Sequence, residues 1–208
     1  MFITKMVSVF IYLLHRIMQI PTIVGNKILE KGRFLSLRQL ELSHPDKKQT
    51  AYEVVTRNSE KVFGIVSILP ITTENEVILI RQYRAPLDRI QLELPAGCAE
   101  VGKHSILEDA VHAELQEETG YTSDDITHIA EFSSSSGMTN ETVHGYIARN
   151  CKKVTDILTL DQDEYIEQML VPIAEFDSLI SSEMLQWNII EPKMLAMIWW
   201  FRNSLAKK

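Results

Sequence analysis

Gly97 to Tyr121 reads GCAEVGKHSILEDAVHAELQEETGY and contains the most informative pattern of the sequence. Its central part, His104 to Thr119, has the spacing of an amphipathic helix, and Gly120 supplies a C-terminal stop. The apolar side of that helix consists of Leu107, Ala110, Val111 and Leu115, and the polar side of Glu108, Asp109, His112 and Gln116.

Three carboxylates of this helix do not follow its polar side. Wound at about 100° per residue, Glu114 and Glu118 project from the middle of the apolar side, and Glu117 falls beside them. Carboxylates directed at a core repel one another and lose hydration, at a cost on the order of several kcal/mol each. A divalent cation removes that conflict, and oxygen ligands at i and i+4 suit Mg²⁺ or Mn²⁺. The pattern therefore predicts a metal site.

The same residues carry a resemblance to a known family. Ala113–Tyr121 (AELQEETGY) resembles the second half of the Nudix box, whose pattern is G-x5-E-x7-R-E-U-x-E-E-x-G-U with U apolar. Leu92–Gly97 (LELPAG) resembles the strand and loop before that box, and Arg81–Arg84 (RQYR) resembles the ADP-ribose pyrophosphatase branch. The resemblance extends from about Lys31 to the C-terminus. It implies an α+β fold, the Nudix α/β/α sandwich with a mixed sheet and an N-terminal β-hairpin region.

Two features depart from the box. Gly97 and Gly120 are 23 positions apart, two more than in the box pattern. The first box glutamate then falls on Lys103 when counted from Gly97, or on Ser105 when counted back from Gly120. The box arginine, which orients the metal-binding carboxylates in the family, is replaced by Ala113. We expect a metal site that still forms but is weaker or differently tuned, and a slow or repurposed enzyme is the alternative.

The resemblance also implies site residues. The metal ligands are Glu114, Glu117, Glu118 and the Ala96 carbonyl, and the candidate catalytic residues are Glu164, Glu141 and Glu117. Glu164 is the preferred base, with Glu141 as its competitor or as an extra metal ligand. The substrate-binding candidates are Phe34 and Tyr52, which would stack on the base and often reach the partner subunit, and Arg57 and Arg84, which would bind phosphate or ribose. Cross-strand packing is the alternative role for the two aromatic residues.

The function implied by the resemblance is Mg²⁺-dependent hydrolysis of ADP-ribose to AMP and ribose 5-phosphate. One alternative is another nucleoside diphosphate sugar (a UDP- or GDP-sugar), because Ser136 replaces the proline of the SPG-x-T/S motif of ADP-ribose hydrolases. The other is a degenerate domain that binds a nucleotide without hydrolysing it, for which Ala113 and the missing first glutamate argue. A homodimer is also implied.

The length and composition indicate the domain organisation and argue against some classes of protein. The chain has 208 residues, and we expect an apolar N-terminal extension over 1–25, an N-terminal β region over 26–60 and the Nudix domain over 61–208. A net charge of −7 argues against a general nucleic-acid binder. Two cysteines, Cys98 and Cys151, fit a reducing compartment, and we expect a cytoplasmic protein.

Met6–Leu14 (MVSVFIYLL) is the ambiguous segment. It is too short for a membrane span, and no A-x-A-like cleavage site follows it. We expect this segment to be an additional amphipathic helix or to come from a start codon assigned too far upstream. Attachment at a membrane surface and a secretory signal are the less favoured alternatives.

The remaining elements follow from periodicity. Phe34–Leu42 and Ala51–Arg57 alternate with period two around a polar turn, which predicts a hairpin. Further strands are expected at Val62–Ile71, Glu76–Tyr83, Ile90–Leu94, Ile126–Phe132, Thr142–Arg149 and Tyr165–Val171, and helices at Ile173–Ile180 and Pro192–Ala206. The last helix carries Trp199 and Trp200, which we expect in a core or a dimer contact. Arg81 is expected to face away from Arg84, because an odd number of positions separates them on one strand.

Overall fold

The structure is a computed structural model, and it describes residues 20–58, 62–160, 164–186 and 188–205. The described residues form two compact units. The first contains residues 20–58 and 134–141, and the second contains the described parts of 62–133 and 142–205. The apolar run Met6–Leu14 lies outside the described residues, so its alternatives stay predictions.

The first unit is a three-stranded antiparallel sheet of β1 (Thr22–Lys31), β2 (Leu35–Ser43) and β3 (Gln49–Arg57). The predicted hairpin is confirmed as β2 and β3, which pair from Leu35 with Arg57 to Ser43 with Gln49. Strand β1 was not predicted, because its apolar residues come in adjacent pairs and do not alternate. Two register shifts in the β1–β2 ladder accommodate that pattern.

The loop of residues 134–141 belongs to this first unit, although it connects two strands of the second. The Val55 amide donates a hydrogen bond to the Met138 carbonyl at 2.8 Å, and the Tyr52 hydroxyl donates one to the Gly137 carbonyl at 2.9 Å. The loop is therefore held against β3.

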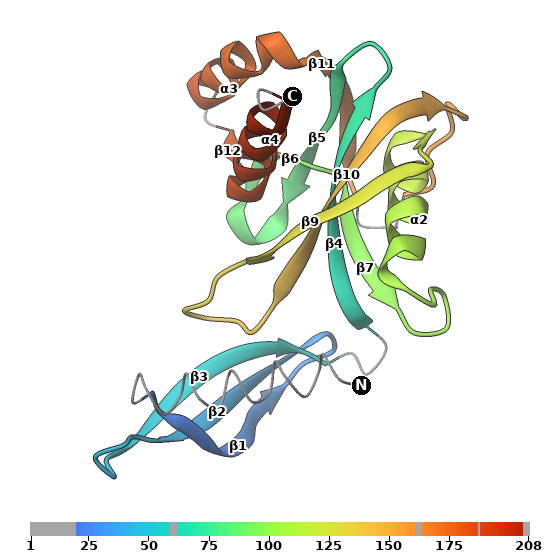
Figure 1. Cartoon of the computed structure of the whole chain (residues 1–208). Helices are drawn as coiled ribbons and strands as arrows, with labels where there is room; N and C mark the ends of the chain where they lie inside the picture. Colours follow the sequence, from blue (N-terminus) through green and yellow to red (C-terminus); the bar gives the residue numbers. More distant parts are fainter. Residues whose placement is uncertain (1–19, 59–61, 161–163, 187, 206–208) are drawn as a thin grey trace. The chain divides into compact units, whose positions relative to one another are not determined.

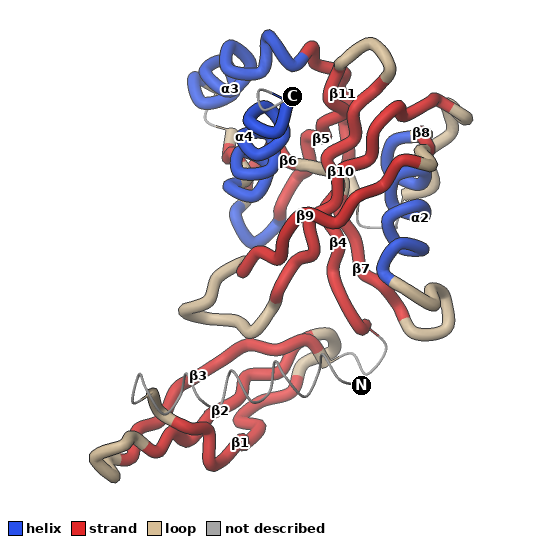
Figure 2. The backbone as a smooth tube through the Cα atoms, viewed as in Figure 1, coloured by secondary structure: helices blue, strands red, loops and turns tan. Residues whose placement is uncertain are grey.

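The second unit is a mixed sheet with helices on both faces (Figures 1 and 2). Its strands are β4 (Val62–Thr72), β5 (Glu76–Arg84), β6 (Arg89–Glu93), β7 (Ala96–Glu100), β8 (Tyr121–Thr122), β9 (Asp125–Ser133), β10 (Thr142–Lys153), β11 (Ile166–Pro172) and β12 (Ile189–Ile190). The strand order is β12-β6-β5-β4-β10-β8, with β11 beside β5, β7 beside β4 and β9 beside β10. The β4–β10 and β6–β12 pairs are parallel. The helices are η1 (Ala85–Leu87), α2 (Leu107–Thr119), η2 (Ile173–Glu175), α3 (Phe176–Leu185) and α4 (Pro192–Leu205).

Alternating side chains of the strands divide the core between two faces. On one face, Ile68 and Ile78 of the sheet pack with Val111 and Leu115 of α2. On the other face, sheet residues pack with α3 and α4 in a second cluster that includes Leu69, Leu79, Leu92, Phe176, Met194 and Met197. The central strands β4, β5 and β10 thus offer one set of residues to α2 and another to α3 and α4.

Helix α2 begins three residues later than predicted. The Asp109 carboxylate accepts hydrogen bonds from the Ser105 and Ile106 amides, at 2.8 and 3.1 Å, and this cap fixes the start at Leu107. The predicted end is confirmed, because Gly120 has φ 73° and lies so close to Thr155 that a Cβ would be 2.2 Å from its carbonyl oxygen. Only glycine fits this C-terminal position.

The predicted C-terminal helix is confirmed as α4, but its tryptophans are not in the core. Met194, Met197, Ile198 and Phe201 are buried, whereas Trp199 is 66% exposed. The core interpretation is therefore wrong for Trp199, and the dimer contact stays a prediction. None of the described helices combines the length and apolar character that crossing a membrane requires.

Candidate active site

Glu118 is the deepest carboxylate of a cluster at the end of α2. Glu118 is only 2% exposed, and its Oε2 accepts a hydrogen bond from the Ala96 amide at 2.9 Å. Burial raises the pKa of Glu118 well above its usual value, and the negative charges of Glu114, Glu164 and Glu93 raise it further. These influences outweigh the hydrogen bond from Ala96. Burial and the neighbouring carboxylates therefore both disfavour a negative charge on Glu118.

Gly97 makes room for a second carboxylate. A Cβ at this position would lie 2.0 Å from the Cδ and Oε1 atoms of Glu114, so the Glu114 carboxylate occupies the space over the start of β7. Any larger residue at position 97 would displace it. The Ala96–Gly97 backbone and the carboxylates of Glu114 and Glu118 thus form one surface.

Glu164 comes to the cluster from a distant part of the sequence. It lies two residues before the start of β11, and its charge contributes to the raised pKa of Glu118. The Tyr83 amide donates a hydrogen bond to the Tyr165 carbonyl at 3.4 Å, which fixes the neighbouring backbone against β5. Of the two candidate bases, Glu164 is therefore the one that the structure places near Glu118 within the second unit.

Glu117 lies at the edge of the cluster and has a cationic partner. Lys103 Nζ is 3.2 Å from Glu117 Oε2. Burial by itself lowers the pKa of Lys103, but the hydrogen bond to Glu117 and the charges of Glu117, Glu114 and Glu100 raise it above its usual value. The Lys103 ammonium therefore lies among three carboxylates.

The donor set of this cluster suits a divalent cation. Its groups are carboxylate oxygens with a backbone carbonyl beside them, and a cation would offset the excess negative charge around Glu118. Within the described ranges, no group of three His, Cys, Asp or Glu side chains converges on one preformed ion position. Glu118 is turned to the Ala96 amide and Glu117 to Lys103 in this arrangement.

Arg84 is held beside the cluster by a partner that the sequence analysis missed. Its Nε and Nη2 donate to the two oxygens of Glu93, at 2.8 and 2.7 Å, and Glu93 is only 1% exposed. Burial raises the pKa of Glu93, and the Arg84 guanidinium opposes that shift. The alternation of Leu92, Glu93 and Leu94 was a usable signal, because it places Glu93 on the face opposite its buried neighbours.

The remaining candidates belong to the first unit. Arg57 Nε donates to Glu141 Oε2 at 2.7 Å, so the predicted phosphate-binding arginine and the competing base form an ion pair. Phe34 and Tyr52 both expose their rings, but the Phe34 carbonyl accepts a hydrogen bond from the amide of Asn58, which follows the end of β3 and lies six residues after Tyr52. Six strand residues span about 20 Å. One copy of the chain therefore does not bring these two rings together around a base.

Comparison with known proteins identifies the family of this chain. The model of the NUDIX domain matches residues 63–192. The chain belongs to the NUDIX family. The box-like motif around Glu114 and Glu118 lies inside the matched region, and the expectation from the resemblance is confirmed.

The relatives of this NUDIX protein include hydrolases of ADP compounds. ADP-ribose pyrophosphatase of Bacillus subtilis is 34% identical over 159 residues, which cover 76% of this chain and 82% of the relative. The methanol dehydrogenase activator of Bacillus methanolicus is 30% identical over 144 residues, 69% of this chain and 74% of the relative. A crystal structure of an ADP compounds hydrolase superposes with a TM-score of 0.72 at 22% identity and covers 91% of this chain and 96% of that chain. The predicted α+β NUDIX fold is confirmed, and the chain is a NUDIX hydrolase.

NUDIX hydrolases generally use divalent metal ions, and the carboxylate cluster of this chain fits such an ion. The departures from the box are visible in the site. Lys103, one of the two positions counted for the first box glutamate, lies beside Glu117. Ala113 carries no charge where the box has arginine.

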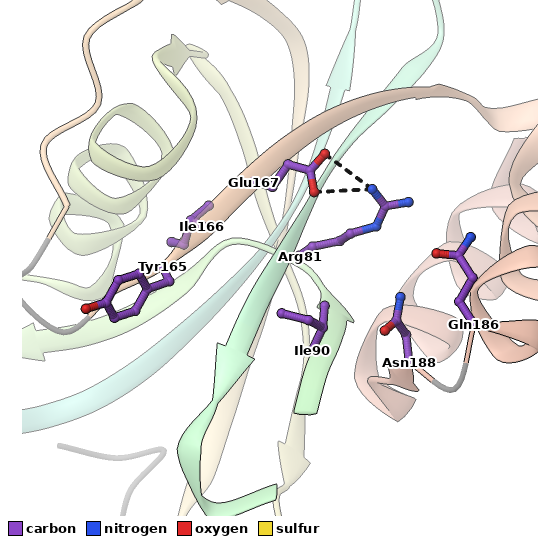
Figure 3. Close-up of a pocket in the computed structure, with 7 residues that line it drawn as sticks. All are labelled: Arg81, Ile90, Tyr165, Ile166, Glu167, Gln186 and Asn188. Atoms are coloured by element: carbon purple, nitrogen blue, oxygen red, sulfur yellow. Dashed lines mark hydrogen bonds and ion pairs between the residues drawn. The ribbon is translucent and has the colours of Figure 1, made fainter. Parts of the chain in front are cut away.

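A separate pocket lies on the other face of the NUDIX sheet (Figure 3). It has a volume of about 530 Å³, and its lining includes Arg81, Ile90, Tyr165, Glu167, Gln186 and Asn188. Arg81 forms ion pairs with the buried Glu183 of α3 and with Glu167 of β11. The expectation that Arg81 faces away from Arg84 is confirmed, since Arg84 pairs with Glu93 on the α2 face.

Proposed function

We propose that this protein hydrolyses the pyrophosphate bond of ADP-ribose to AMP and ribose 5-phosphate, with Mg²⁺ as the ion. The observation that carries the proposal is the burial of Glu118 beside Glu114 and Glu164, together with the ADP-ribose pyrophosphatase relative at 34% identity. A carboxylate cluster of this kind is costly for a fold that only binds a nucleotide. A hydrolase, in contrast, needs such carboxylates to hold its metal ion.

The residues divide the work by position. Glu114, Glu117, Glu118 and the Ala96 carbonyl would hold the ion. When bound, Mg²⁺ neutralises the diphosphate and makes a bound water more acidic. Glu164 accepts a proton from the attacking water, whose oxygen bonds to one phosphorus as the P–O–P bond breaks. Arg84, fixed by Glu93, pairs with a phosphate oxygen.

Base recognition is proposed for Phe34 or Tyr52 of the first unit, with Arg57 as a further contact to phosphate or ribose. Both aromatic rings are exposed, which leaves a face for stacking. Stacking does not select one base, so a substrate assay is needed to distinguish ADP-ribose from UDP- and GDP-sugars as the substrate.

Glu164→Gln should lower the turnover number for ADP-ribose by about 10²- to 10⁴-fold, because glutamine cannot accept the proton. The measurement is release of AMP from ADP-ribose in Mg²⁺, with EDTA as the metal-free control and with UDP-glucose and GDP-mannose as competing substrates. Glu167→Gln is the matched control, since Glu167 lies three residues away and pairs with Arg81 on the opposite face.

Full activity of Glu164→Gln would assign the base to another carboxylate, of which Glu141 is the next candidate. Preference for a UDP- or GDP-sugar would keep the mechanism and reject the substrate. Binding of ADP-ribose with no hydrolysis by the unaltered protein would instead support a non-catalytic nucleotide-binding domain.

We also propose that two copies of the chain associate through the first unit. Its small sheet leaves Ile23, Val24 and Phe34 more than half exposed, and such apolar surface is commonly covered in an assembly. Sedimentation equilibrium should give twice the chain mass at micromolar concentration, and Ile23→Lys with Phe34→Lys should shift it towards the monomer. A monomer of the unaltered protein at that concentration would contradict the proposal.

A further inference from the structure

The turn between β7 and α2 is built to hold one side chain in place. The amides of Lys103 and His104 both donate to the Glu100 carbonyl, at 3.3 and 2.9 Å, and the Glu100 amide donates to His104 Nδ1 at 3.0 Å. Gly102 has φ 91°, a conformation that other residues rarely adopt. His104 is buried under the turn. This arrangement fixes the backbone from which Lys103 extends.

The Lys103 side chain extends towards the carboxylate cluster. Its ammonium is 3.2 Å from Glu117, and the charges of Glu114 and Glu100 also act on it. The side chain is 48% exposed, so it combines contact with the cluster and access to solvent. Lys103 therefore presents a positive charge to two of the proposed metal ligands, Glu114 and Glu117.

The sequence makes this charge unusual. Counted from Gly97, the box pattern has a glutamate at position 103, and the chain has a lysine there. On this count the charge of the box residue is reversed, and on the count back from Gly120, which places the glutamate at Ser105, it is lost. The box arginine is also missing, because Ala113 replaces it. The cluster has lost one carboxylate and one cation of the pattern, and it has gained a cation in a different place.

We propose that Lys103 is a tethered cation of the carboxylate cluster, which occupies the Oε2 atom of Glu117 and so competes there with a divalent ion. The inference rests on the proposed function, because it takes the cluster as the metal site. Two positive charges a few ångströms apart repel, and the repulsion is doubled when one of them is divalent. The cluster of this chain accordingly binds a divalent ion at Glu117 more weakly than it would with a neutral residue at position 103.

The test is a titration of the full-length protein with Mn²⁺, followed by calorimetry and by the electron paramagnetic resonance signal of free Mn²⁺. Lys103→Met removes the charge and keeps the apolar stem. We expect it to bind the weakest Mn²⁺ at least about tenfold more tightly, or to bind one Mn²⁺ more than the unaltered protein. Lys103→Gln serves as a second neutral variant, and circular dichroism establishes that each variant is folded.

The matched control is Lys153→Met. Lys153 also pairs with one carboxylate, Asp156, and its side chain is 47% exposed, but it lies at the end of β10 near Tyr121. It should bind Mn²⁺ as the unaltered protein does. A tighter site in Lys153→Met as well would attribute the effect to net charge and overturn the proposal.

The unaltered protein and the variants answer separate questions. If neither the unaltered protein nor the Lys103 variants bind Mn²⁺, the metal site of the proposed function fails and this inference fails with it. If the unaltered protein binds Mn²⁺ and both neutral variants bind it equally or more weakly, the proposed function stands and only the role of Lys103 is overturned. Weaker binding would then mean that Lys103 orients Glu117 for the ion.

Discussion

Glu118→Gln is expected to lower the turnover of ADP-ribose by about three orders of magnitude and to make the metal-free protein more stable at neutral pH. The activity is lost because the amide brings no negative charge to the proposed metal site. The substitution keeps an oxygen that accepts the hydrogen bond from the Ala96 amide, so the backbone at the site stays in place.

The gain in stability follows from the direction of the pKa shift. Burial and neighbouring carboxylates raise the pKa of Glu118 in the folded protein, so folding favours its protonated form. The stability that this group contributes is fully present below the pKa of an unfolded-state glutamate, and it is lost as the pH rises through the higher folded-state pKa. Glutamine has no such loss. The difference between variant and unaltered protein should therefore be close to zero near pH 4 and grow towards pH 8.

Thermal unfolding in EDTA across this pH range checks the stability, and AMP release in Mg²⁺ checks the activity. A rise in melting temperature of at least about 2 °C at pH 7.5 corresponds to roughly 1 kcal/mol for a chain of this size. Glu108→Gln is the control, because Glu108 is an exposed carboxylate on the same helix. An active Glu118→Gln enzyme would refute the metal site, and a lower neutral-pH melting temperature would refute the electrostatic argument.

Gly97→Ala is expected to lower turnover by about 100-fold with little loss of stability. The added methyl group would meet the Glu114 carboxylate at 2.0 Å, so the carboxylate has to move away from the start of β7. The displaced atoms are the far end of a flexible side chain, and the fold can absorb that movement. The function cannot, because Glu114 is a proposed metal ligand.

Gly64→Ala is the matched control for this change. Gly64 lies on β4, opposite Ala99 of β7, and a Cβ added to Gly64 would meet Leu107 Cδ2 at 2.5 Å. It should therefore affect packing more than chemistry. Mn²⁺ affinity, melting temperature and turnover are measured for both variants. Unchanged turnover and Mn²⁺ affinity in Gly97→Ala would remove Glu114 from the site.

Local periodicity was enough to predict the hairpin of β2 and β3 and the helix that carries the carboxylates. The burial of Glu118 followed from winding residues 104–119 at the helical angle, because α2 is regular and one face is covered by the sheet. Strand β7 escaped prediction, since Ala96, Gly97, Cys98 and Ala99 give no strong β signal.

Long-range pairings were harder to predict than local elements. Arg57 and Glu141 are 84 positions apart, and nothing in the local pattern of either residue indicates the ion pair between them. The Arg84–Glu93 pair was partly accessible, because Glu93 lies between the buried Leu92 and Leu94 on a strand adjacent to that of Arg84. Its recognition required knowing that β5 and β6 are paired in this register.

Strand β5 presents Arg84 to the α2 face of the sheet and Arg81 to the face covered by α3. Successive side chains of a strand point to opposite faces of the sheet. If one residue added or removed before β5 shifted the strand by one position, the side chains that face α2 and those that face α3 would be exchanged. Arg84 would then lose its ion pair with Glu93, and Arg81 would lose its ion pair with Glu183. We therefore expect a one-residue length change between Thr72 and Glu76 that carries into β5 to remove both ion pairs. Substitutions in this turn are restricted at Asn75, which has φ 60°.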